Sequence, residues 1–366
     1  MTKPGTRNKG KVTISDVSRL AGCSKGVVSA VVNNARGNIS VSDQMRKRVL
    51  DAAAELGYRP NYASQCLARN ATKTLGIYVA PAEGASVGYP YEGRILRGIE
   101  MACRAHDYDL LILNIGGSVS PEQCLQRFAE GRVDGVIIVH ASPEANWISS
   151  LSAFNQNVVA VNHYGPHQLL TNVVFDDHQA GVIAAKELAR LGHTRIGYLG
   201  GVAADHGPGG ERRLSGYHKG MAEAGLPIHD AWIYDVRGPH FADVSVGTGW
   251  SWEDGPNGAD YFLSLVENRP TALVVYGDTL GLKAMHHFQN AGLNIPRDIS
   301  LITIGGSETC HTANPMLSSA HMPLEEMSEY AALVLIDKTH RDSDDPFERK
   351  LWAPSLVPRD STAPPA

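Results

Sequence analysis

Positively charged side chains are concentrated at the amino-terminal end of this 366-residue chain. Residues 1–73 contain 13 Lys and Arg residues against 4 Asp and Glu residues, a net charge of +9. The whole chain carries −5, so the remaining residues carry −14. Clustered ammonium and guanidinium groups neutralise phosphates. A basic head on an acidic body therefore predicts nucleic-acid binding, and a basic face that meets only solvent is the alternative.

A second group of residues has the chemistry to hold a small polar ligand. Arg213 carries a planar fork of donors, and Asp278 offers two acceptor oxygens to vicinal hydroxyls or to a ring nitrogen. Trp250 presents a flat apolar face on which a sugar or a base can stack, and Tyr91 can close the opposite side. The alternatives are that Arg213 pairs with a structural acid and that Trp250 packs within its loop.

The other reactive groups form no pattern for catalysis or metal binding. The five cysteines have no C-x-x-C spacing, so we expect reduced thiols. His286 and His287 are adjacent, and on a helix they would point about 100° apart, which disfavours shared coordination of one ion. No nucleophile elbow or phosphate-binding loop is present. We expect no enzyme activity, no metal and no cofactor.

Three short helices must position the basic side chains of the head. The first begins with a capping-box spacing between Thr13 and Asp16. Gly22 then allows a tight turn, and Ser24 can cap the next helix. A third helix begins after Ser42. Two helices joined by such a turn form a helix-turn-helix, and the third helix completes a small core.

A short hinge follows the head. Pro60 favours an extended residue before it, and Asn61 can cap a helix over residues 62–69. This helix has too few apolar residues to stay folded in isolation. We therefore predict a hinge helix that orders when two copies meet on DNA. The alternative is a flexible linker in which Leu67 packs against the body.

From residue 74 onward, short apolar strands alternate with helices. One run covers residues 75–161 and a second covers residues 173–304. Such alternation indicates parallel sheets built from βαβ units, which bind ligands beyond the carboxyl ends of the strands. An amphipathic helix over residues 327–336 lies either at a dimer face or in the core. No apolar run reaches membrane-spanning length, and residues 1–11 lack the apolar core of a secretory signal.

Ordered motifs make the chain resemble the lactose/galactose repressor family of bacterial transcriptional regulators. In the head they include residues 12–17 (VTISDV), 21–24 (AGCS), 31–33 (VVN) and 55–61 (ELGYRPN). In the body they include residues 191–197 (LGHTRIG), 213–217 (RLSGY) and 356–362 (LVPRDST). The resemblance implies an α-helical helix-turn-helix head on an α/β two-lobed body similar to periplasmic sugar-binding proteins.

The resemblance also implies residue roles. It places Lys25, Gly26 and Ala30 at base edges and Ser29 and Asn33 against phosphates. The other implied DNA-binding residues are Thr13, Ser24, Tyr58, Asn61, Leu67 and Ala68, with Leu67 as a wedge in the minor groove. For the effector, it implies contacts from Arg213 and Asp278, a platform at Trp250, and further contacts from Tyr91 and Asn162.

This chain departs from the family pattern in the recognition helix. Ala30 has no hydrogen-bond donor and Gly26 has no side chain, so Lys25 is the strong donor of the three and suits guanine O6 and N7. The loop over residues 34–41 is longer than usual in the family. We therefore expect more of the DNA specificity to come from the hinge and from DNA deformation.

The expected organisation has four parts. They are a disordered arm (1–11), a helix-turn-helix domain (12–60), a hinge (61–72) and an effector-binding and dimerisation body (73–366). Within the body, with chain crossings near 170, 300 and 325, we expect an amino-terminal subdomain of about 73–170 and 300–325. A carboxy-terminal subdomain would take about 171–299 and 326–350.

The expected function follows from these observations together. We expect a cytoplasmic, ligand-responsive repressor that binds a near-palindromic DNA operator as a homodimer, without contact with a membrane. A small polar effector, a sugar or sugar derivative, would bind between the subdomains. The competing classes are a solute-binding protein, which needs an export signal, and an enzyme on the same scaffold, which needs a catalytic constellation.

Overall fold

The computed structural model divides the chain into two compact units, Met1–Lys73 and Thr74–Ala366. The residues that it describes are 12–33, 40–79, 90–112, 123, 126–128, 130–139, 157–164, 170–201, 208–236, 254–340 and 348–366. The predicted arm over residues 1–11 lies outside the described residues, and so does most of the loop after Asn33.

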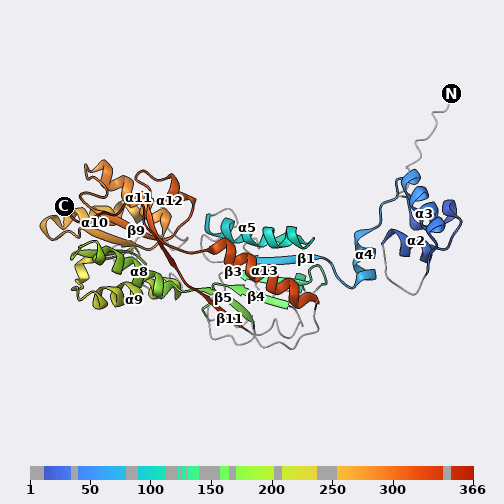
Figure 1. The fold of residues 1–366 in the computed structure, drawn as a ribbon, viewed down its shortest axis with the longest axis horizontal. Coiled ribbons are helices and arrows are strands. Elements are labelled where there is room, and N and C mark those ends of the chain that lie inside the picture. Colours follow the sequence, from blue (N-terminus) through green and yellow to red (C-terminus); the bar gives the residue numbers. More distant parts are fainter. Residues whose placement is uncertain are drawn as a thin grey trace, which may run out of the picture. The chain divides into compact units, whose positions relative to one another are not determined.

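The first unit contains helices at the positions where capping signals occur in the sequence. They are α1 (Ile14–Ala21), α2 (Lys25–Val32), α3 (Asp43–Leu56) and α4 (Tyr62–Arg69) (Figure 1). Gly22 and Gly57 end α1 and α3 in the left-handed conformation, which glycine adopts without steric cost. One small core joins the first three helices through Val17, Ala21, Val28, Val31, Val49, Ala52 and Ala53.

The described residues of the second unit form two six-stranded sheets, and each is the centre of one lobe. In the first lobe the strand order is β11-β5-β4-β3-β1-β2, and every neighbouring pair is parallel. The strands are β1 (Thr74–Val79), β2 (Asp109–Ile112), β3 (Gly135–Val139), β4 (Asn157–Val161), β5 (Thr171–Phe175) and β11 (Arg349–Trp352). Helices α5 (Pro90–Ala105) and α13 (Leu324–His340) pack in this lobe.

The second lobe has the strand order β12-β10-β9-β8-β6-β7, in which only the β10–β12 pair is antiparallel. Its strands are β6 (Ile196–Gly200), β7 (Ile233–Asp235), β8 (Ala272–Val275), β9 (Ser300–Gly305), β10 (Ser318–His321) and β12 (Ser355–Val357). Its helices are α8 (Asp177–Arg190), α9 (Pro208–Glu223), α10 (Asp254–Ser264), α11 (Asp278–Asn290) and α12 (Glu308–Thr312), with 3-10 turns at Asp230–Trp232 and Val266–Asn268.

Among the described elements, the chain passes between the lobes three times, and the expected segment assignment needs correction. The crossings fall between β5 and α8, between β10 and α13, and between β11 and β12. Residues 300–321 therefore belong to the second lobe, because β9 pairs with β8 and β10 pairs with β9. Residues 171–175 and 326–340 belong to the first lobe instead, where α13 packs on α5 and β4 (Figure 1).

The helix predicted over residues 327–336 is part of the core. It lies inside α13, and its side chains at Met327, Ala331 and Leu335 are fully buried. This spacing places them on one face of the helix, which packs against α5, β3 and β4. The alternatives for this segment are a dimer face and the core, and the face with these three residues lies in the core.

Candidate nucleic-acid interface and ligand site

The second helix of the head leaves its predicted base-reading positions open. The Ser24 hydroxyl accepts a hydrogen bond from the Val27 amide at 3.3 Å and so caps α2. Val28 and Val31 are buried, whereas Lys25 and Gly26 are exposed. Ala30 is half-buried. The burial of the valine face fixes which side of α2 faces outward, and Lys25 is the charged donor on that side.

The side chains predicted to meet phosphates are engaged with one another. Asn33 donates from Nδ2 to the Ser29 hydroxyl at 3.1 Å. Its Oδ1 accepts a hydrogen bond from Gln65 Nε2 at 3.2 Å. Thr13 is also engaged, because its hydroxyl donates to the Asp16 carboxylate at 2.7 Å. This bond lowers the pKa of Asp16. The link from Asn33 to Gln65 was not foreseen from the sequence.

The hinge helix α4 is capped at both ends but buries little. Asn61 Oδ1 accepts from the Ala63 amide at 3.0 Å, and Asn70 ends the helix in the left-handed conformation. Leu67 is 88% exposed. The neighbouring Ala68 lies in the same helix, and its side chain is outside the described residues. Tyr58, before the hinge, packs against the head core.

Not all basic side chains of α3 are available to DNA. Arg48 donates to the Ala21 carbonyl at 2.6 Å, so it caps the end of α1. Its guanidinium lies against Gly22, where an added Cβ would be 2.9 Å from Nη2. Lys47 is exposed and Arg46 is half-exposed. Arg46, Lys47 and Arg48 are adjacent in the sequence, but the contact with the Ala21 carbonyl makes Arg48 unavailable to DNA.

In the body, Arg213 pairs with a structural acid. Its Nε donates to Asp177 Oδ1 at 2.6 Å, and its Nη1 donates to the Tyr276 carbonyl at 2.6 Å. The guanidinium carbon lies 4.3 Å from the centroid of the Tyr276 ring. Burial lowers the pKa of Arg213, but the Asp177 carboxylate outweighs this and keeps the pKa above its ordinary value. The Arg213 guanidinium therefore stays charged.

The first lobe contributes Tyr91 and Asn162 to the same region. Asn162 Nδ2 donates to the Tyr91 hydroxyl at 2.6 Å, and Asn162 Oδ1 accepts from the Phe175 amide at 2.8 Å. Tyr164, two residues further on, donates its hydroxyl to Asp177. This bond joins the loop after β4 to the start of α8, and thus the first lobe to the second.

Asp278 is held by a different set of partners. Its carboxylate accepts hydrogen bonds from the Thr303 hydroxyl at 2.7 Å, the Gly306 amide at 3.1 Å and the Ser307 amide at 2.7 Å. Burial raises the pKa of Asp278, but the hydrogen bonds from Thr303 and Ser307 outweigh it, so the pKa is lowered. The carboxylate therefore stays ionised and ties α11 to the turn after β9.

The predicted ligand residues differ in where the structure places them. Tyr91, Asn162 and Arg213 belong to one cluster around Asp177, whereas Trp250 lies outside the described residues. Arg213 lies in the first turns of a helix, because α9 begins at Pro208. Tyr91 likewise lies in α5, and Asp278 is the first residue of α11.

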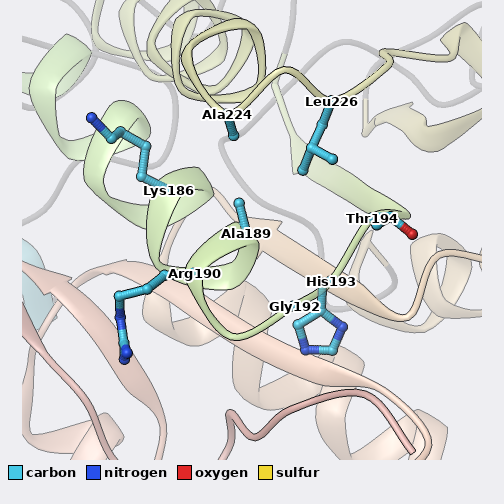
Figure 2. A pocket seen from close by; sticks show the side chains of 8 residues that line it. All are labelled: Lys186, Ala189, Arg190, Gly192, His193, Thr194, Ala224 and Leu226. Carbon is cyan, nitrogen blue, oxygen red and sulfur yellow. The ribbon is translucent and has the colours of Figure 1, made fainter.

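A surface groove of about 310 Å³ lies elsewhere on the second lobe (Figure 2). It is at the carboxyl end of α8, roughly 20 Å along that helix from Asp177. Its charged side chains are already paired, Lys186 with Glu223 at 2.9 Å and Arg190 with Glu187 at 2.7 Å. His193 at its edge is also engaged, through Thr271 and the Ala363 carbonyl. The groove thus offers no unmatched charge to a ligand.

Within the described part of the chain, no group of three His, Cys, Asp or Glu side chains could hold a metal ion. The cysteines in that part, Cys23, Cys66, Cys103 and Cys310, are free thiols. None of the described helices is long and apolar enough to span a bilayer.

Comparisons with known proteins agree with the two units. Residues 13–61 match the family model of bacterial regulatory proteins, lacI family, and residues 185–362 match that of a periplasmic binding protein-like domain. The HTH-type transcriptional repressor PurR of Photobacterium profundum is 29% identical over 353 residues, which are 95% of this chain and 98% of that protein. The PurR protein of Vibrio cholerae El Tor is 28% identical, over 95% and 97% of the two chains.

Solved structures share the fold. The lac repressor dimer bound to operator and an anti-inducer has a TM-score of 0.77 at 23% identity, covering 96% of this chain and 99% of that chain. A lacI-family regulator from Mycobacterium smegmatis has a TM-score of 0.63 at 26% identity, covering 80% and 100%. A basic helix-turn-helix head joined to a two-lobed α/β body defines a DNA-binding transcriptional regulator. The head of the chain matches the lacI family of bacterial regulatory proteins, and the chain is similar over almost its full length to repressors of that type.

Proposed function

We propose that this protein is a transcriptional repressor that binds a near-palindromic operator as a homodimer and responds to a small polar effector. The observation that carries the proposal is the head: Lys25 is exposed at the start of α2, and Leu67 is 88% exposed on α4. Two such heads related by a twofold axis meet half-sites about one DNA turn apart. The site of action is the cytoplasm, and no catalytic step is involved.

The proposed division of the chain follows the boundaries expected from the sequence. Residues 12–60 bind the major groove, residues 61–72 form the hinge and the body begins at residue 73. Leu67 from each copy enters the minor groove and kinks the duplex, at a cost of a few kcal/mol per unstacked step. Lys25 supplies the main direct base contact.

The effector is proposed to bind between the lobes, with contacts from Arg213, Asp278, Tyr91 and Asn162 and with Trp250 as a stacking platform. The body is proposed to take a sugar or a sugar derivative. Relatives of this fold support the ligand class, since a CelR regulator was solved as a cellobiose complex and an Enterococcus faecium regulator with bound ribose. Effector binding changes lobe closure and thereby the distance between the two hinges.

A ligand screen coupled to DNA binding tests this function. The full chain is heated with individual sugars, polyols and nucleobases, and compounds that raise the melting temperature are then added to a fluorescent operator complex. We expect a compound that changes operator affinity by about 5- to 150-fold. A compound that raises the melting temperature without changing DNA affinity would contradict the coupling. A screen in which no compound has either effect would contradict an effector of this class.

A further inference from the structure

A hydrogen-bonded path joins the recognition helix α2 to the hinge helix α4. Gln65 Nε2 donates to Asn33 Oδ1 at 3.2 Å, and Asn33 Nδ2 donates to the Ser29 hydroxyl at 3.1 Å. Ser29 lies in the middle of α2 and Gln65 in the middle of α4. Both helices belong to the same compact unit. The path therefore connects the element that reads the major groove with the one that reaches the minor groove.

The position of Gln65 on α4 determines where Leu67 points. Two residues along a helix correspond to a rotation of about 200°, so the side chains at 65 and 67 lie on opposite faces. The exposure of the α4 side chains differs between these two faces in the same way. Gln65 and Cys66 are half-buried, whereas Ala63, Ser64 and Leu67 are exposed. The face that contains Gln65 is turned toward the head, and the face that contains Leu67 is turned away.

We propose that Gln65 is a positioning residue for operator recognition, whose hydrogen bond to Asn33 sets the rotation of α4 relative to α2. It holds Leu67 at a fixed direction and distance from Lys25. The protein then binds most tightly to operators that have one particular separation between each half-site and the operator centre. This inference rests on the proposed function, because it assumes that Leu67 enters DNA.

Operator spacing is the quantity that this arrangement controls. One extra base pair between a half-site and the centre moves the two contacts apart by about 3.4 Å and rotates them by about 35°. If the hinge helix is fixed relative to the head, Lys25 and Leu67 cannot both keep their DNA contacts after this displacement and rotation. A head whose hinge helix rotates freely can follow them in part, so loss of the Gln65 contact relaxes the spacing preference.

The test uses the full chain and a duplex that the wild-type protein selects from a random-sequence pool. Affinity is measured for this duplex, for the same duplex with one base pair inserted between each half-site and the centre, and for a scrambled duplex. We expect Gln65→Ala to reduce the preference for the original spacing by about 2- to 10-fold, the range expected for one hydrogen bond. Gln44→Ala, an identical change at an exposed position of α3, should leave the preference unchanged.

Two further variants separate positioning from a general structural effect. Asn33→Ala should relax the spacing preference as Gln65→Ala does, and the double variant should add little to either. Leu67→Ala should cost less affinity in the Gln65→Ala background than in the wild type, because the wedge is already misdirected.

Different outcomes would contradict the positioning role of Gln65 and the proposed repressor function. Additive effects of the changes at 33 and 65, an unaltered spacing preference, or an equal loss of affinity for the scrambled duplex would each overturn the positioning role. If the wild-type chain selects no palindromic duplex, the proposed function itself fails.

Discussion

Arg213 is held in place before any ligand arrives. Asp177 fixes its Nε and the Tyr276 carbonyl fixes its Nη1. An arginine whose side chain is oriented by buried partners loses little conformational entropy when it binds a further group. The same contacts give it a structural role, because breaking a buried ion pair leaves a charge without compensation. A substitution at Arg213 therefore affects folding, and in the proposed function it also affects effector binding.

Asp177→Ala is the residue-scale prediction that isolates this structural role. Removal of the carboxylate leaves the buried guanidinium of Arg213 without its counter-charge, and we expect a loss of about 3–5 kcal/mol in the free energy of unfolding. Urea unfolding followed by tryptophan fluorescence measures it, since all five tryptophans lie in the body.

The adjacent residue provides the control for this prediction. Asp176 accepts a hydrogen bond from the Gln179 amide and caps α8. Asp176→Ala removes only that cap, so we expect it to cost about 1 kcal/mol. Equal losses for Asp176→Ala and Asp177→Ala would show that the ion pair contributes nothing specific.

The residue scale is where prediction from the sequence was least complete. The chemistry of Arg213 identifies it as a candidate, but its partner Asp177 is 36 positions away, and no local pattern names a partner at that distance. The bond between Gln65 and Asn33 could not be predicted for the same reason, because these residues are 32 positions apart. Side chains whose positions depend on helix capping, such as Ser24, could be placed from sequence because the cap is local.

At the scale of elements, close helix packing holds the first lobe together. Helices α5 and α13 come from distant parts of the chain and pack against each other. Gly98 allows the close approach, because a Cβ added there would lie 2.1 Å from the Glu325 carbonyl oxygen. Next to it, Arg94 donates to Glu325 at 2.7 Å and to the Met322 carbonyl at 2.8 Å. The contact thus also fixes the crossing between β10 and α13.

Gly98→Ala is the prediction at this scale, with Gly93→Ala as its matched control in the same helix. The added methyl group at 98 must push α5 from α13, and we expect a loss of about 1–3 kcal/mol in the free energy of unfolding. At 93 no atom lies within 4 Å of an added Cβ. Alanine there should be neutral or stabilising by up to about 1 kcal/mol, from its greater helix propensity. Similar effects of the two changes would contradict the packing explanation.

The order of strands and helices could be predicted from hydrophobic periodicity, but their assignment to lobes could not. Strand β9 has the same apolar composition whichever sheet it joins, and only pairing with β8 decides its place. Helix α13 follows a second-lobe strand yet packs in the first lobe. Periodicity reports which face of an element is buried, not which neighbour buries it.

On the scale of the whole molecule, the head and the body carry net charges of opposite sign. A head of +9 attracts the phosphate backbone, and a body of −14 does not compete for it. In the proposed function the head would reach bases through few side chains, since Gly26 and Ala30 offer no hydrogen-bond donor. In that proposal the hinge around Leu67 supplies much of the discrimination between operators, through the energy of deforming the duplex. Specificity should therefore depend on sequence at the operator centre as well as in the half-sites.

The most direct test is a titration of the full chain against a fluorescent palindromic duplex selected by that chain and against a scrambled duplex of the same composition. At about 0.15 M salt we expect the palindrome to bind at least 1,000-fold more tightly, within the ~10³–10⁷ range for specific regulators. Leu67→Ala should reduce that ratio while leaving affinity for the scrambled duplex unchanged. Equal binding of the two duplexes by the wild-type chain would contradict sequence-specific repression.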